Sequence, residues 1–232
     1  MNKSSIRYLA VGWIGTMGWV NLGQAGVSGE PGQAPQITVY VYNWPQVEPN
    51  NLREAKEVVT RIFRKAGVEA TLLDARATSS EVKGKEPQRL AQTNLFVHIL
   101  SLPMAESLRL PTQVLGVAPG DPQDLKREQV YVLEPVAERM AQEQVKVKAR
   151  ESHTVFASKG QILGHGIAHE IGHVLLHQSA HSPAGLMRSQ WYPTDFENMV
   201  GGNLHFTLEE AKRIRAEVSR RNAMKIELDP GR

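Results

Sequence analysis

Five short segments within the first 133 positions of the chain have the apolar character of strands, and the first of them alternates between apolar and polar residues. Residues 37–42 (ITVYVY) follow this period of two and are rich in β-branched and aromatic side chains, so they predict a β-strand. The same reasoning predicts four further short strands, at residues 68–73, 95–100, 114–117 and 129–133.

Between and after these strands the apolar period changes to that of a helix. Residues 50–66 predict a helix that ends at Gly67, and residues 135–147 predict a second one. The polar residues 79–92 predict a surface loop, and the Pro-Gly-Asp-Pro sequence at 119–122 predicts a turn.

Two pairs of residues have the spacing of a helix N-terminal capping box. Ser158 precedes Gln161 at the start of a long apolar stretch, and Thr207 precedes Glu210 at the start of an amphipathic one. The order strand, helix, four strands, then helices predicts an α/β (α+β) fold with a mostly parallel sheet, formed by one domain at residues 37–228.

The N-terminal residues have the composition of a secretory signal. Lys3 and Arg7 precede an apolar stretch at 9–20, and small residues follow it at 23–25. The apolar stretch is too short to span a bilayer comfortably. We therefore expect a secreted or periplasmic protein with a signal peptide at 1–25, a short linker at 26–36, the domain at 37–228 and a tail at 229–232.

Net charge limits the kinds of binding partner that are expected, and cysteine content limits the means of stabilisation. The formal net charge of +3 falls to about +1 once Lys3 and Arg7 are removed, so strong attraction to nucleic acid is not expected. We also expect no stable membrane insertion after signal removal. The chain has no cysteine, so it uses no disulfide for stability.

A single pentapeptide, His-Glu-Ile-Gly-His at 169–173, has the residues and spacing of hydrolytic zinc chemistry. On a helix, His169 and His173 lie on one face, where two imidazoles can bind one ion. Glu170 then stands beside the metal as a general base.

A hydrolytic zinc site usually has three protein ligands and leaves a position for water. Turn-forming residues at 179–185 can bring the chain back toward the helix, which makes His181 the candidate third ligand. His177 competes for this role, but on a continued helix it lies about 12 Å along the axis from His169. We expect His177 to be a residue of the helix C-terminal end, favoured by the helix dipole.

The sequence HEIGHVLLHQSAHSPAGLMRSQW at 169–191 resembles the zinc-binding segment of the metzincin clan of zinc peptidases, and within it the matrixin-like proteins. The clan signature is H-E-x-x-H-x-x-G-x-x-H followed by a Met-turn. The likeness includes His169, Glu170 and His173, the pair His181-Ser182, and Met187 as the Met-turn residue.

The segment departs from that signature at two positions. His181 comes eight residues after His173, whereas the clan spacing is six, so the turn is two residues longer. Leu176 replaces the glycine, and Ser179 stands where the clan has its third ligand.

The resemblance implies a metzincin-like fold with an active-site helix, a Met-turn and a C-terminal helix. It also implies Zn²⁺ held by His169, His173 and His181, with Glu170 taking a proton from the zinc-bound water. The expected function is that of a secreted zinc metalloendopeptidase acting on peptide or protein substrates. The alternative from another class is a catalytically silent secreted zinc-binding protein that acts as a binding module.

In other zinc peptidases the third zinc ligand is a glutamate or an aspartate further along the chain. Glu197 and Asp195 lie near the required spacing, but neither has the flanking residues that those patterns carry. We expect His165 to pack in the core and Tyr192 to have an aromatic packing role. No function is assigned to the remaining histidines, His98, His153 and His205.

Overall fold

The computed structural model describes residues 34–75, 93–118, 128–148 and 156–228. In this part of the chain, five strands form one sheet in the spatial order β2-β1-β3-β5-β4. Four strands are parallel, and β4 runs antiparallel to β5 at one edge. The strands are β1 (Gln36–Asn43), β2 (Glu69–Ala75), β3 (Asn94–Leu100), β4 (Gly116–Val117) and β5 (Gln129–Leu133).

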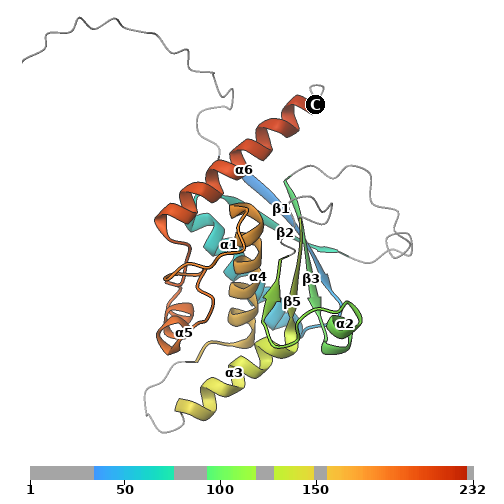
Figure 1. The fold of residues 1–232 in the computed structure, drawn as a ribbon, viewed down its shortest axis with the longest axis vertical. Helices are drawn as coiled ribbons and strands as arrows, with labels where there is room; N and C mark the ends of the chain where they lie inside the picture. The colour runs from blue at the N-terminus through green and yellow to red at the C-terminus, as the bar shows by residue number, and fades with distance from the viewer. Residues whose placement is uncertain (1–33, 76–92, 119–127, 149–155, 229–232) are drawn as a thin grey trace, which may run out of the picture.

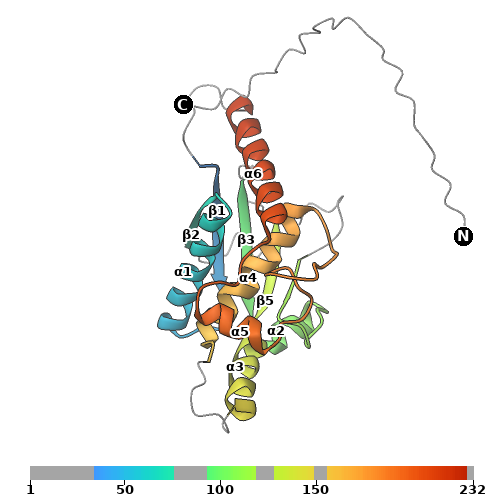
Figure 2. The same ribbon diagram turned by 90° about the vertical axis from the view of Figure 1, so that its left-hand side faces the viewer.

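Helices pack on the sheet and extend beyond its ends. They are α1 (Pro49–Lys65), α2 (Leu102–Ser107), α3 (Glu134–Lys148), α4 (Lys159–Leu176), α5 (Pro193–Val200) and α6 (Leu208–Leu228). Figures 1 and 2 show α1 and α4 side by side against one face of the sheet, with α6 crossing the C-terminal end of α4. The mixed α/β class and the mostly parallel sheet are therefore confirmed.

The main hydrophobic core lies between the sheet and this pair of helices. Every second residue of β1 is buried there, which explains the alternation along that strand. Helix α4 is buried along almost its whole length, including His169 and Glu170, whereas His173 is half-buried. Polar side chains on α4 therefore depend on partners from other elements, because a buried polar group without a hydrogen bond costs free energy.

The predicted strands and long helices all have counterparts, whereas two short helices, α2 and α5, were not predicted. Strand β4 is also shorter than the predicted 114–117 segment. The predicted loop at 79–92, the turn at 119–122, the signal at 1–25, most of the linker and the tail at 229–232 lie outside the described residues. In the described ranges, no helix is both long and apolar enough to cross a membrane.

The predicted capping boxes at Ser158 and Thr207 are confirmed. The backbone N–H of Gln161 donates to Ser158 Oγ over 3.0 Å, and Ser158 N–H donates back to Gln161 Oε1 over 3.0 Å. Ser158 Oγ also donates to a carboxylate oxygen of Glu54 on α1. This serine therefore fixes the start of α4 and its contact with α1.

We expect Ser158→Ala to lower the free energy of unfolding by about 1–2 kcal/mol, because it removes an N-cap acceptor and the donor to Glu54. Urea unfolding followed by circular dichroism measures the change. Ser189→Ala, at an exposed loop position, is the control and should stay within about 0.5 kcal/mol of the wild type. Equal stability of the two variants would contradict the assigned role of Ser158.

Candidate metal centre

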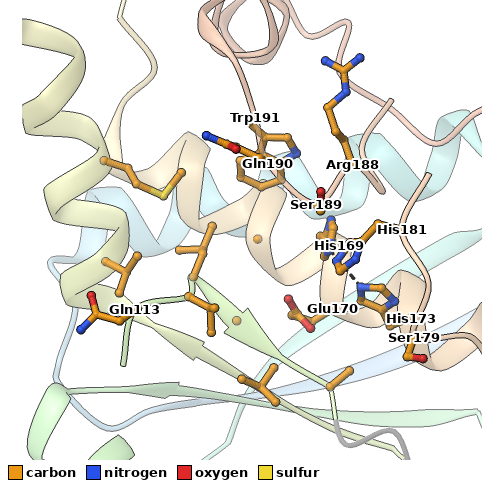
Figure 3. Close-up of a pocket in the computed structure, with 18 of the residues that line it drawn as sticks. Gln113, His169, Glu170, His173, Ser179, His181, Arg188, Ser189, Gln190 and Trp191 are labelled. Atoms are coloured by element: carbon orange, nitrogen blue, oxygen red, sulfur yellow. Dashed lines mark hydrogen bonds between the residues drawn. The ribbon is translucent and has the colours of Figure 1, made fainter. Parts of the chain in front are cut away.

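Two histidines of α4 and one from the loop that follows it lie close together. His169 and His173 lie one helical turn apart, and their Nε2 atoms are 3.0 Å from each other. The loop after α4 brings the ring of His181 to 5.3 Å and 4.8 Å from theirs, measured between ring centroids. One nitrogen from each residue lies within 4.8 Å of the others, and among the described residues this is the one such group of possible metal ligands (Figure 3).

Backbone carbonyls fix the tautomers of the two helical histidines. Nδ1 of His169 lies 2.8 Å from the carbonyl oxygen of Leu186, and Nδ1 of His173 lies 2.8 Å from that of Gln178. Because a carbonyl can only accept, both Nδ1 atoms carry hydrogens and both Nε2 atoms have a lone pair when the rings are neutral. Burial favours the neutral form, since it lowers the pKa of His169 to about 4 and also lowers that of His173.

This donor arrangement suits a divalent metal ion. Two lone pairs that face each other across 3.0 Å repel unless a cation or a proton stands between them. Ligand nitrogens of a tetrahedral zinc site lie about 3.3 Å apart, close to this separation. Zinc-binding histidines usually donate their other ring N–H to a carboxylate, a backbone carbonyl or water, and both helical histidines have such a carbonyl partner.

His177 lies outside the cluster. Helix α4 ends at Leu176, and His177 is its C-cap residue, with a left-handed backbone at φ 51°. Its Nε2 atom lies 2.8 Å from a carboxylate oxygen of Glu217 on α6. The predicted place of His177 at the C-terminal end of the helix is thus confirmed.

Glu170 is buried between α4 and the edge strand β4, with 7% of its surface exposed. The backbone N–H of Ala118 donates to its carboxylate, and a Cβ on Gly116 would come within 2.5 Å of its Cγ atom. Burial raises the pKa of Glu170 to about 8, while the bond from Ala118 acts in the opposite direction. Figure 3 shows the carboxylate beside the histidines.

The turn that contains Met187 packs against α4 next to the histidines. Met187 is fully buried, and its sulfur would come within 2.6 Å of a Cβ placed on Gly172 of α4. The carbonyl of Leu186 accepts from His169 and also from Nε1–H of Trp191, over 3.2 Å. Sequence reasoning missed Trp191, because a tryptophan at this distance from the motif has no recognisable signal.

The other carboxylates considered as ligands lie elsewhere. Asp195 is buried on α5, where it accepts from Arg188 over 3.1 Å and from the backbone N–H of Tyr192 over 2.8 Å. Glu197 is exposed on the same helix and does not belong to the histidine cluster. Tyr192 is 51% exposed, and the guanidinium carbon of the half-buried Arg188 lies 5.4 Å from its ring centroid, so its ring stacks on a cation at the surface and is not packed in the core.

The remaining histidines also lie apart from the cluster. His165 is 1% exposed in the core, as predicted, and its Nδ1–H donates to the carbonyl of Gln161. His98 lies in β3, and His205 lies in the segment before α6. His153 lies outside the described residues.

A cavity of about 1070 Å³ opens beside the cluster, and the three histidines and Glu170 all line it. Helix α3 forms one wall, which the sequence did not indicate, and the segment after Met187 forms another. Much of the lining is apolar and comes from Leu115, Val136, Met140, Trp191 and Phe196. The site therefore has room for a ligand of peptide size.

Comparison with protein-family models finds no match for this chain, and a search of curated proteins finds none either. The fold and the site define an α/β protein in which three histidines and a buried glutamate share one open cavity.

Proposed function

We propose that this protein is a secreted, zinc-dependent endopeptidase with a metzincin-like fold. The observation that carries the proposal is the convergence of His169, His173 and His181 beside the buried carboxylate of Glu170, at the wall of one cavity. The resemblance of residues 169–191 to the metzincin segment supports it, as do a buried methionine turn next to the histidines and a C-terminal helix packed on α4.

The metal would be held by the Nε2 atoms of His169 and His173 and by one ring nitrogen of His181. Bound there, zinc would polarise a peptide carbonyl and lower the pKa of a water molecule. The carbonyls of Leu186 and Gln178 hold the helical rings in the tautomer that this role needs.

Glu170 would act as the general base and then as the general acid. Its carboxylate accepts a proton from the attacking water as the new C–O bond forms, and it passes that proton to the amine nitrogen as the C–N bond breaks. Ala118 N–H and the close approach of Gly116 keep the side chain beside the histidines. The apolar walls would accommodate the side chains of a peptide substrate.

Incubation of the purified protein with a diverse peptide library, analysed by mass spectrometry, tests this proposal. We expect cleavage at internal peptide bonds that stops in a zinc chelator and returns when Zn²⁺ is restored. Binding of zinc with no cleavage of any peptide would favour the binding-module alternative.

The proposed location outside the cytoplasm has its own test. We expect the mature protein to begin at or near Gly26, because residues 1–25 have the composition of a cleaved signal. N-terminal sequencing of extracytoplasmic material checks this prediction. Recovery of an intact Met1 in the soluble cytoplasmic fraction would contradict it.

A further inference from the structure

His181 depends on the backbone of its loop for its position. It lies in the irregular segment between α4 and α5, and its side chain is exposed. Its described ring contacts are with His169 and His173, the other two members of the cluster. Ordering of the adjacent backbone therefore decides whether His181 can reach the same ion as the two helical histidines.

Ser182, the next residue, is anchored through both of its hydrogen-bond donors. Its backbone N–H donates to the carbonyl of Met187 over 2.8 Å, which closes the turn next to the cluster. Its Oγ–H donates to a carboxylate oxygen of Glu210 in the first turn of α6. Ser182, which directly follows His181, thus ties the loop to a residue of α6 that lies 28 positions further along the chain.

Glu210 is a buried carboxylate, with 4% of its surface exposed. Its second oxygen accepts from the backbone N–H of Thr207 over 2.8 Å, and its own backbone N–H donates to Thr207 Oγ1 over 3.3 Å. No basic side chain in the described ranges lies within ion-pair distance of it. The capping box of α6 needs only Thr207 and Glu210, so the bond to Ser182 is an additional use of the carboxylate.

We propose that Ser182 and Glu210 are positioning residues that hold His181 at the metal site, an inference that rests on the proposed function. Glu210 is fixed by the capping box at the start of α6, which is anchored in the core through Ile214 and Val218. Its oxygen then fixes Ser182, and Ser182 limits the conformations of His181. Without this link the loop would keep its backbone bonds, such as Ser182 N–H to Met187, but would lose its tie to α6, so metal binding would have to supply part of the ordering at a cost in conformational entropy.

The test measures metal binding, separately from activity, in full-length protein. We expect Ser182→Ala to weaken zinc affinity by about tenfold, in the range found when residues that support metal ligands are changed. Chelator competition gives the affinity, and the visible absorption of the Co²⁺-loaded protein reports the coordination geometry. In Ser182→Ala, the visible absorption per bound Co²⁺ ion should differ from that of the wild type. In Ser182→Thr, which keeps the hydroxyl, it should equal that of the wild type.

Thr207→Ala is the matched control. It removes the other side of the same capping box and should lower the free energy of unfolding by about 1 kcal/mol, because an N-cap is lost. Its zinc affinity should stay within about twofold of the wild type, because the bond from Ser182 to Glu210 remains. If Ser182→Ala does not fold, Ser182→Val takes its place and is compared with Ser182→Thr. These two side chains have nearly the same volume, and only threonine keeps the hydroxyl that donates to Glu210.

Two results would overturn the inference. One is a Ser182 variant without the hydroxyl that binds zinc as tightly as the wild type and gives the same Co²⁺ spectrum. The other is an equal loss of affinity in Thr207→Ala, which would assign the effect to the stability of α6. Failure of the wild type to bind zinc would instead overturn the proposed function.

Discussion

Glu170→Gln should lower kcat/KM for peptide hydrolysis by about 10³- to 10⁴-fold while the protein still binds one zinc ion. Glutamine has nearly the same shape, so it keeps the contacts with Gly116 and Ala118, but it cannot accept the proton from water. The three histidines are unchanged, so metal affinity should change little. Steady-state kinetics on a peptide found in the library screen, together with zinc analysis of the same sample, measures both quantities.

The control for this variant is Glu143→Gln. Glu143 is an exposed carboxyl side chain on α3 that lines the same cavity, so the two variants make the same carboxyl-to-amide change in the same space. We expect Glu143→Gln to keep kcat/KM within about tenfold of the wild type, because it does not contact the cluster. A loss of less than tenfold in Glu170→Gln would contradict the role of Glu170 as general base.

His181→Ala should lower zinc affinity by more than about 100-fold, because two protein ligands remain where three are needed. His177→Ala should keep a stoichiometry near one, because His177 pairs with Glu217 on α6 and does not belong to the histidine cluster. Zinc content after gel filtration in dilute chelator separates the two variants.

The opposite pattern, with zinc lost in His177→Ala and kept in His181→Ala, would assign the third ligand to His177. Such a result would require His177 to leave Glu217 and turn back toward α4. It would also remove the basis for the role given to Ser182.

Local sequence patterns predicted the frame of the fold because each depends on residues that are close along the chain. The alternation of residues 37–42 reflects one buried and one half-exposed face of β1. The spacing of Ser158 and Gln161 located the start of α4, and the capping bonds form within that same turn. The positions of His169 and His173 on one face follow directly from helical geometry.

The supporting interactions of the site could not be predicted, because they join distant segments or use backbone atoms. The carbonyls of Leu186 and Gln178 hold the histidine rings, and a carbonyl has no sequence signature. Gly116 approaches Glu170 only because β4 packs over α4. The bond from Ser182 to Glu210 depends on how α6 docks beside the loop.

The unpredicted elements have related physical explanations. Helices α2 and α5 span Leu102–Ser107 and Pro193–Val200, too short for a helical period to stand out from the surrounding loop residues. Helix α3 was predicted from its sequence, but its place as a cavity wall depends on tertiary packing. Periodicity therefore identified the long elements without showing which of them would enclose the site.

The most direct test of the central claim is a zinc titration of metal-free protein in which peptide cleavage and bound metal are measured in the same samples. We predict that cleavage rises in proportion to bound zinc and reaches its plateau at one equivalent. Zinc that binds at one equivalent without producing cleavage, or cleavage that does not depend on zinc, would contradict the assignment of a zinc-dependent endopeptidase.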